Sequence, residues 1–373
     1  MFRNVTPEKA IEFTWLSVAV MCCLPLPATA TRSQLLRFKI LRFLGALCAC
    51  GLILPLLYAV YMKYDDPVIF TNAAGLAVAV CQVPVHVYLS IIYYDRIQAM
   101  IEYMTNYCGK AKSSERQVLQ RYVDKYATFY GLCTAWFYVT AAVFDVGALF
   151  AAQPFPSNAE YPFAVDYEPL KSLIFLHHVV VSFQCSGAVC MNAVAALMIL
   201  FAAARFEILM LELRAVQNVE TLIRCVKEYH LVRSYAQEVV SVFRHTVIYT
   251  TCMATVPLVL SGLSMIGHQP LVIKLQFLFL GGIALLEVYL CAWPADDLFT
   301  VSESVVRSVY ESKWYEQNVG MQKTVLLALL PQRPITISLA CVIPALSLEF
   351  YCSYVANAFS LFTALRLVVN DET

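Results

Sequence analysis

Histidines, cysteines and acidic residues are the side chains of this sequence that could bind a metal ion or attack a substrate. A zinc hydrolase embedded in a membrane would need several histidines and a carboxylate grouped at one depth. The six histidines form no such group along the sequence: His86, His177, His178, His230, His245 and His268. The adjacent pair would point about 100° apart on a helix, so both cannot bind one metal ion. The 14 cysteines are scattered, without a C-x-x-C pair. From the sequence we therefore expect no metal site, no cofactor and no enzymatic activity.

Five polar side chains interrupt long apolar stretches: Gln82, His86, Asp145, Gln184 and Glu287. Polar groups are costly in lipid, so these side chains should face the interior of a helix bundle. For Glu287 we expect a role in gating or assembly rather than in ligand binding.

The composition indicates a membrane protein. Of the 373 residues, 60% are hydrophobic and 14% charged, whereas soluble domains are about 45–50% apolar and about 25% charged. There is no basic block with interleaved aromatic residues, so we expect no nucleic-acid partner. A bilayer core of about 30 Å requires about 20 apolar residues in a helix. We expect an all-α polytopic protein with seven transmembrane helices at Phe43–Met62, Pro67–Tyr94, Tyr126–Ala152, Ser172–Ala204, Thr246–Ile273, Leu275–Ala295 and Ile335–Leu365.

The lysines and arginines predict the orientation of these helices. Twenty-two of the 26 precede the first helix or lie in the second-to-third, fourth-to-fifth and sixth-to-seventh connections. Positive charge marks the cytoplasmic side, so the N-terminus should be cytoplasmic and the C-terminus extracellular. A G-protein-coupled receptor has the reverse orientation, so no G protein should be required. Within the cytoplasmic region 1–42, the apolar stretch Phe13–Ala30 could be a cleaved signal peptide or a short segment that dips into the membrane. The arginines that follow it disfavour a signal peptide, so we expect the membrane-dipping segment.

The connections differ between the two sides. The cytoplasmic regions 205–245 and 296–334 have helical spacing, with an apolar stripe in the first and a possible capping box, Thr300–Glu303, in the second. They could form a packed anchor beneath the membrane or a loose set of solvated helices. The outer connection Gln153–Pro169 is rich in proline and aromatic residues. It could be a lid over a pocket or a cap without a ligand role. The apolar stripe of the cytoplasmic region 205–245 consists of Phe206, Leu209, Met210, Leu213 and Val216.

Several motifs resemble the insect odorant-receptor family in order and spacing. Those motifs are Tyr161–Phe163 with Asp166, Ala292–Pro294 through Thr300, Ser302-Glu303, Val309–Tyr315, Gln332–Ile335, Leu346–Glu349 and Ala358–Arg366. The resemblance implies a ligand-gated, non-selective cation channel in the plasma membrane of olfactory sensory neurons. It also implies a heterotetramer with a common odorant co-receptor subunit, and a small volatile bound in the outer half of each tuned subunit. A gustatory receptor channel that acts without this co-receptor is the alternative.

The last helix carries a candidate pore face. Ser353, Asn357, Ser360 and Ala364 recur at helical spacing, with Leu367 continuing the stripe. Small and polar residues on one face suit a water-filled pore or close helix packing. The resemblance implies a gate at Ala364, Leu367 and Val368.

Residues in the outer halves of the helices could line an apolar ligand cavity, since small residues beside aromatic ones leave room for a compact volatile. Each position could instead serve only in helix packing. The available rings favour an aromatic ligand. The candidates within segments 43–204 and 246–295 are Ala73, Leu76, Tyr138, Ala142, Val146, His177, Val181, Phe277, Leu280 and Gly281. The predicted pore-lining seventh helix and the extracellular tail after it occupy residues 335–373.

Overall fold

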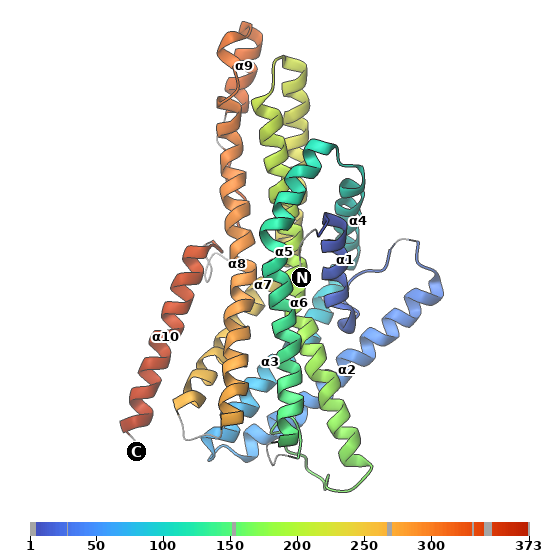
Figure 1. Ribbon diagram of the computed structural model, residues 1–373, viewed down its shortest axis with the longest axis vertical. Helices are drawn as coiled ribbons and strands as arrows, with labels where there is room; N and C mark the ends of the chain where they lie inside the picture. The colour runs from blue at the N-terminus through green and yellow to red at the C-terminus, as the bar shows by residue number, and fades with distance from the viewer. Residues whose placement is uncertain are drawn as a thin grey trace.

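The computed structural model describes residues 5–27, 29–150, 154–266, 271–329, 332–338 and 345–371, and in these ranges all regular structure is helical. Figure 1 shows one elongated bundle, with α9 at one end and the C-terminus towards the other. The helices are α1 (Pro7–Ser17), η1 (Ala19–Met21), α2 (Arg32–Met62), α3 (Pro67–Ile92), α4 (Tyr94–Lys110), α5 (Ser113–Phe150), α6 (Leu170–Arg214), α7 (Val219–Ile266), α8 (Leu271–Tyr310), η2 (Trp314–Glu316), α9 (Val319–Ala328) and α10 (Leu348–Asp371).

Six of the described helices, α2, α3, α5, α6, α7 and α8, are long and apolar enough to cross a membrane. Three of them are much longer than a bilayer requires, because α6, α7 and α8 have 45, 48 and 40 residues. At about 1.5 Å per residue they extend about 60–72 Å, roughly twice the hydrocarbon thickness. A helix of this length that crosses a bilayer must extend beyond it. The sequence Gly267-His268-Gln269-Pro270 predicts a turn between the fifth and sixth predicted helices, and these residues lie outside the described ones.

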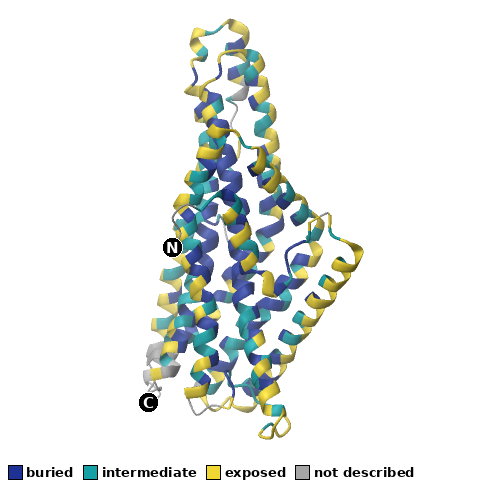
Figure 2. Ribbon diagram, turned by 45° about the vertical axis from the view of Figure 1, so that its right-hand side comes forward, coloured by how far each residue is buried: buried dark blue, intermediate teal, exposed yellow. Residues whose placement is uncertain are grey.

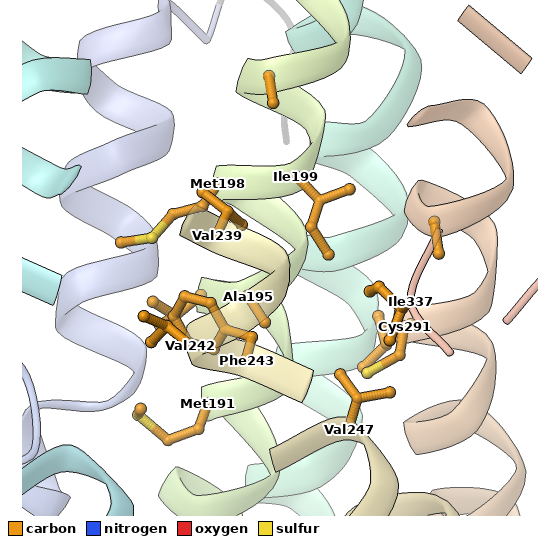
Figure 3. Packing of buried hydrophobic residues seen from close by; sticks show 14 of the residues in the cluster. Met191, Ala195, Met198, Ile199, Val239, Val242, Phe243, Val247, Cys291 and Ile337 are labelled. Atoms are coloured by element: carbon orange, nitrogen blue, oxygen red, sulfur yellow. The ribbon is translucent and has the colours of Figure 1, made fainter. Parts of the chain in front are cut away.

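Helix α6 is the centre of the bundle. Its most apolar window is 83% buried within the chain, whereas that of α2 is only 28% buried. A helix that is apolar on all sides belongs in a core, and the small residues between Ser186 and Ala204 let neighbouring helices approach closely. Figure 3 shows α6 meeting α7 in this core, where Met198 and Ile199 lie near Val239 and Val242. Figure 2 shows buried residues along the centre of the bundle, with α2 exposed at its side.

The ends of α6, α7 and α8 distant from the 154–169 loop form a packed unit rather than loose helices. All five residues of the predicted stripe, Phe206 to Val216, are at most 8% exposed. Arg205 pairs with Glu228, which joins α6 to α7. The capping box predicted at Thr300–Glu303 is wrong, because α8 continues through these residues to Tyr310.

The last long helix begins later than its hydropathy indicates. Residues 332–338 have no regular secondary structure, and the Ile335 N–H donates to Ser302 Oγ of α8 at 3.0 Å. Helix α10 begins at Leu348 rather than at Ile335, where Ser347 Oγ accepts a hydrogen bond from the Phe350 N–H at 3.2 Å. The Leu348 N–H donates to Asp296 of α8 at 3.3 Å. Contacts with α8 and an N-cap therefore set this boundary.

The N-terminal segment around Met21 packs against the bundle of its own chain. The backbone turns at Cys22, whose φ is 50°, and Met21 and Cys23 are buried. A Cβ added at Gly187 of α6 would lie 2.9 Å from Met21 Cγ, so glycine allows this close approach. Arg42 Nε donates to the Cys22 carbonyl at 2.8 Å. These contacts fix the N-terminal segment between helices.

Candidate ligand-binding site

A cavity of about 110 Å³ lies among α2, α3, α5, α6, α7 and α8, beneath the 154–169 loop. Its wall is largely apolar. Phe137 and Phe144 of α5 supply rings, and Val181 of α6 and Leu280 of α8 supply aliphatic side chains. Small apolar pockets of this kind bind compact ligands mainly by burial.

The 154–169 loop forms the roof of this cavity through Pro156 and Ser157. Ser157 Oγ and Tyr161 Oη lie 3.1 and 2.9 Å from the two ring nitrogens of His178. Phe155 is 2% exposed, and its ring lies 5.4 Å from the ring of His178. The aromatic residues of the loop thus hold it over the cavity, an arrangement that favours a lid over a pocket, one of the two alternatives for this loop.

Three of the ten predicted ligand residues line the cavity: Leu76, Val181 and Leu280. The other seven lie elsewhere. His177 Nε2 is 2.8 Å from the Cys48 carbonyl, and the Tyr138 hydroxyl donates to the Ser17 carbonyl at 2.6 Å. Val146 is 49% exposed on the outside of the bundle. The remaining four, outside the cavity lining, are Ala73, Ala142, Phe277 and Gly281.

Helix α5 accounts for three of these seven residues. The cavity face of α5 consists of Phe137, Thr140, Ala141, Phe144 and Asp145, whereas the sequence analysis chose Tyr138, Ala142 and Val146. Each of those three follows a lining residue by one position, and one position rotates the side chain by about 100°. On α6 the same shift separates His177 from His178. Polarity could have indicated the face of α5 that meets the cavity, because Asp145 is the only charged residue in the apolar part of this helix.

Polar groups form part of the cavity wall. Gln82 Nε2 donates to Glu287 Oε2 at 3.2 Å, and Ser182 Oγ donates to Asp145 Oδ2 at 2.7 Å. All five polar residues expected to face the bundle interior are at most 7% exposed, which confirms that prediction. Glu287 lines the cavity, although we expected it to act away from the ligand.

Residues 68–359 match the family model described as 7tm Odorant receptor. The match begins in α3 and ends in α10, so it includes five of the six helices around the cavity. This chain belongs to the 7tm odorant receptor family. The resemblance seen in the sequence motifs is confirmed at the level of the family, which is a family of receptors and not of enzymes.

Solved structures of an insect olfactory receptor have the same fold as this odorant receptor. OR5 from Machilis hrabei is 12% identical, with a TM-score of 0.80 over 96% of this chain and 97% of that chain. The structure of OR5 in complex with eugenol is 13% identical, with a TM-score of 0.83 over 97% and 98%. No curated protein matches the sequence.

The predicted pore face of this odorant receptor is uncovered in the single chain. Ser353, Asn357, Ser360 and Ala364 are exposed, whereas Ala358 on another face of α10 is buried. Figure 1 shows α10 at the edge of the bundle beside α8. Leu367 and Val368, the rest of the predicted gate, lie in α10 with side chains outside the described part.

Proposed function

We propose that this chain is the odorant-binding subunit of a heteromeric, ligand-gated, non-selective cation channel, opened by a small volatile in the roofed cavity. The observation that carries the proposal is a largely apolar cavity beneath the 154–169 loop in a member of the odorant receptor family. The OR5 structure in complex with eugenol supports an odorant as the ligand of this fold. Leu76, Val181 and Leu280 contact the ligand, and the rings of Phe137 and Phe144 favour an aromatic one.

The chain crosses the plasma membrane of olfactory sensory neurons seven times, with α10 as the seventh span. The N-terminus is cytoplasmic, because 22 of the 26 lysines and arginines belong to the N-terminal region and the alternate connections. The packed unit around Arg205 then projects into the cytoplasm. The roof loop 154–169 lies outside the cell, so odorants reach the cavity from the extracellular side.

Helix α10 lines the ion pathway when subunits assemble. Its exposed small and polar residues, Ser353, Asn357, Ser360 and Ala364, suit a water-filled pore, and Leu367 and Val368 continue towards the gate. One chain supplies only one such helix, so the pore requires other subunits. The partner is the common odorant co-receptor, and no G protein participates.

Current recorded from oocytes tests this function. The chain is expressed with and without an insect odorant co-receptor, and eugenol, 2-phenylethanol, acetophenone and hexyl acetate are applied. We expect odorant-evoked cation current only when both chains are present. Current from this chain alone would favour the gustatory-type alternative. Silence in both cases, with both chains detected at the cell surface, would contradict the proposed function.

A further inference from the structure

A groove of about 410 Å³ lies between α7 and the segment 333–336, and it shares no lining residue with the cavity beneath the 154–169 loop. Among the described residues of its wall there is no aspartate or glutamate. A concave surface with positive charge and without acids attracts anions. The basic side chains of the wall are Arg233, Arg244, His245 and Arg333.

Two of these arginines have unused hydrogen-bond donors. Arg244 forms no hydrogen bond or ion pair with any residue that the structure describes, and its Nε is buried. Arg333 is engaged only through its backbone carbonyl, which accepts from Arg233 Nη2 at 2.9 Å, so its guanidinium has no acceptor within the described chain. A guanidinium has five N–H donors. Both side chains are therefore available to an anion from outside the chain.

The acid that lies beside the groove is already paired. Glu238 of α7 forms an ion pair with Arg96 of α4. Arg96 Nη2 also donates to the hydroxyl of Ser241, in the groove wall, at 3.2 Å. Glu238 therefore neutralises Arg96 and leaves the charge of the three arginines in the wall uncompensated.

The groove begins where the membrane is expected to end. The fifth predicted membrane helix starts at Thr246, directly after His245, and His245 Nδ1 lies 3.2 Å from Tyr93 Oη at the end of the second predicted helix. Arg233 precedes Arg244 by 11 residues. At about 1.5 Å and about 100° per residue, the two lie on one face of α7, about 16 Å apart along the helix. The groove thus leads from the membrane boundary away from the bilayer.

We propose that this groove binds an anion that carries several phosphate groups, as the head group of a polyphosphorylated phospholipid does. Basic pockets beside membrane helices on the cytoplasmic side bind such head groups. The phosphodiester lies near Arg244 at the membrane boundary, and the outer phosphates lie near Arg233 and Arg333. The inference rests on the proposed orientation of the chain, which places the groove in the cytoplasm. A soluble inositol phosphate has the same chemistry, and the experiment separates the two sources.

Binding to the purified full-length chain in detergent tests the groove without a channel. The probe is a fluorescent short-chain phosphatidylinositol bisphosphate, followed by fluorescence polarisation. The competitors are unlabelled phosphatidylinositol bisphosphate, phosphatidylserine with the same acyl chains, and inositol trisphosphate. One phosphate cannot reach both ends of the groove. We therefore expect the bisphosphate lipid to compete at a concentration at least about tenfold lower than phosphatidylserine does, the change expected from one further charge-assisted contact.

Two variants remove a positive charge that makes no contact within the described chain. Arg244→Gln and Arg333→Gln should each raise the Kd of the probe about tenfold, because each removes a bidentate phosphate partner. Arg244→Lys and Arg333→Lys keep the charge and lose the planar fork, so each should weaken binding less than the glutamine variant does. Arg224→Gln is the matched control, because Arg224 is exposed on the same helix and lies outside the groove wall. It should leave the Kd within about threefold.

The outcomes separate the groove from the channel. Weaker binding in Arg244→Gln and Arg333→Gln, with Arg224→Gln unchanged, supports the proposal. Tighter binding of the lipid than of inositol trisphosphate then assigns the anion to the membrane, and equal binding assigns it to the soluble pool. Equal competition by phosphatidylserine, equal losses in all three glutamine variants, or no binding would overturn the inference. Odorant-evoked current without binding overturns the groove alone, whereas binding without odorant-evoked current supports the groove and contradicts the channel.

Discussion

The ion pair between the buried Arg205 and the partly exposed Glu228 gives a stability prediction with a definite asymmetry. The Arg205 side chain is 4% exposed, and the Glu228 side chain is 37% exposed. Arg205 Nε and Nη1 have no partner within the described residues, and its Cζ lies 3.6 Å from the centre of the Tyr107 ring. Glu228 is therefore the main compensation for a buried positive charge.

Removing the charge of Glu228 should be costly. Breaking a fully buried pair by removing one partner costs about 3–5 kcal/mol. We reduce this to about 2–3 kcal/mol, because Glu228 is partly exposed and the Tyr107 ring still contacts the guanidinium. For a chain of this size about 1 kcal/mol corresponds to roughly 2 °C, so Glu228→Gln should lower the Tm by about 4–6 °C.

Removing the arginine should cost much less. In Arg205→Met an apolar side chain of similar length replaces the buried charge, and Glu228 can turn towards water, so the Tm should change by less than about 2 °C. Adding Glu228→Gln to Arg205→Met should cause no further loss. The assay is thermal unfolding of the purified protein in detergent, followed by the loss of its monodisperse size-exclusion peak. An Arg205→Met variant as unstable as Glu228→Gln would refute the reasoning.

Two further predictions concern other contacts. Gly262→Ala should lower the Tm in the same assay, because an added Cβ would lie 2.8 Å from the Phe362 ring, whereas Gly109→Ala should not, since a Cβ there meets nothing within 4 Å. Equal Tm values for the two variants would contradict the α7–α10 contact. The hydrogen bond from Arg96 lowers the pKa of Glu238 in the folded protein. This pair therefore stabilises the protein at pH values above the pKa of glutamate in the unfolded chain, about 4.3, and the stabilisation is lost as the pH falls through the lower pKa of the folded state. The Tm advantage of the wild type over Glu238→Gln should therefore be present at pH 7 and vanish in acid; an advantage that persists there would contradict this linkage.

Hydropathy was sufficient to predict most of the long helices and the existence of the apolar stripe, because both depend on the apolar content and its period, but whether the stripe was packed stayed open until the structure showed its burial. Hydropathy could not determine which face of α5 meets the ligand. A membrane helix is apolar on the lipid side as well as on the protein side, so Ala141 and Ala142 look alike in the sequence. The start of α10 was also hidden, since it depends on contacts with Ser302 and Asp296 far away in the chain.

Polar residues carried the signal that hydropathy lacked. Asp145 and Glu287 were correctly expected to face the bundle interior, because an acid facing lipid is costly. Each acid also shows which face of its helix points inwards. Ala141 and Ala284 lie one turn before the two acids on that face, and both line the cavity. The adjacent His177 and His178 are distinguished only by the roof loop, through Ser157 and Tyr161.

The most direct test of the account is a pair of neighbouring substitutions on α5. Ala141 lines the cavity, and Ala142 does not. Ala141→Leu adds three carbon atoms to the wall of a cavity of about 110 Å³. The test odorant is whichever of eugenol, phenethylamine, 2-phenylethanol and acetophenone acts on the wild type at the lowest concentration. The variant should raise the effective concentration of that odorant about tenfold or more, because the leucine side chain excludes part of the ligand. Ala142→Leu should leave it within about threefold, with surface expression measured for both. Equal effects of the two variants, or a larger effect at Ala142, would contradict the placement of the odorant in this cavity.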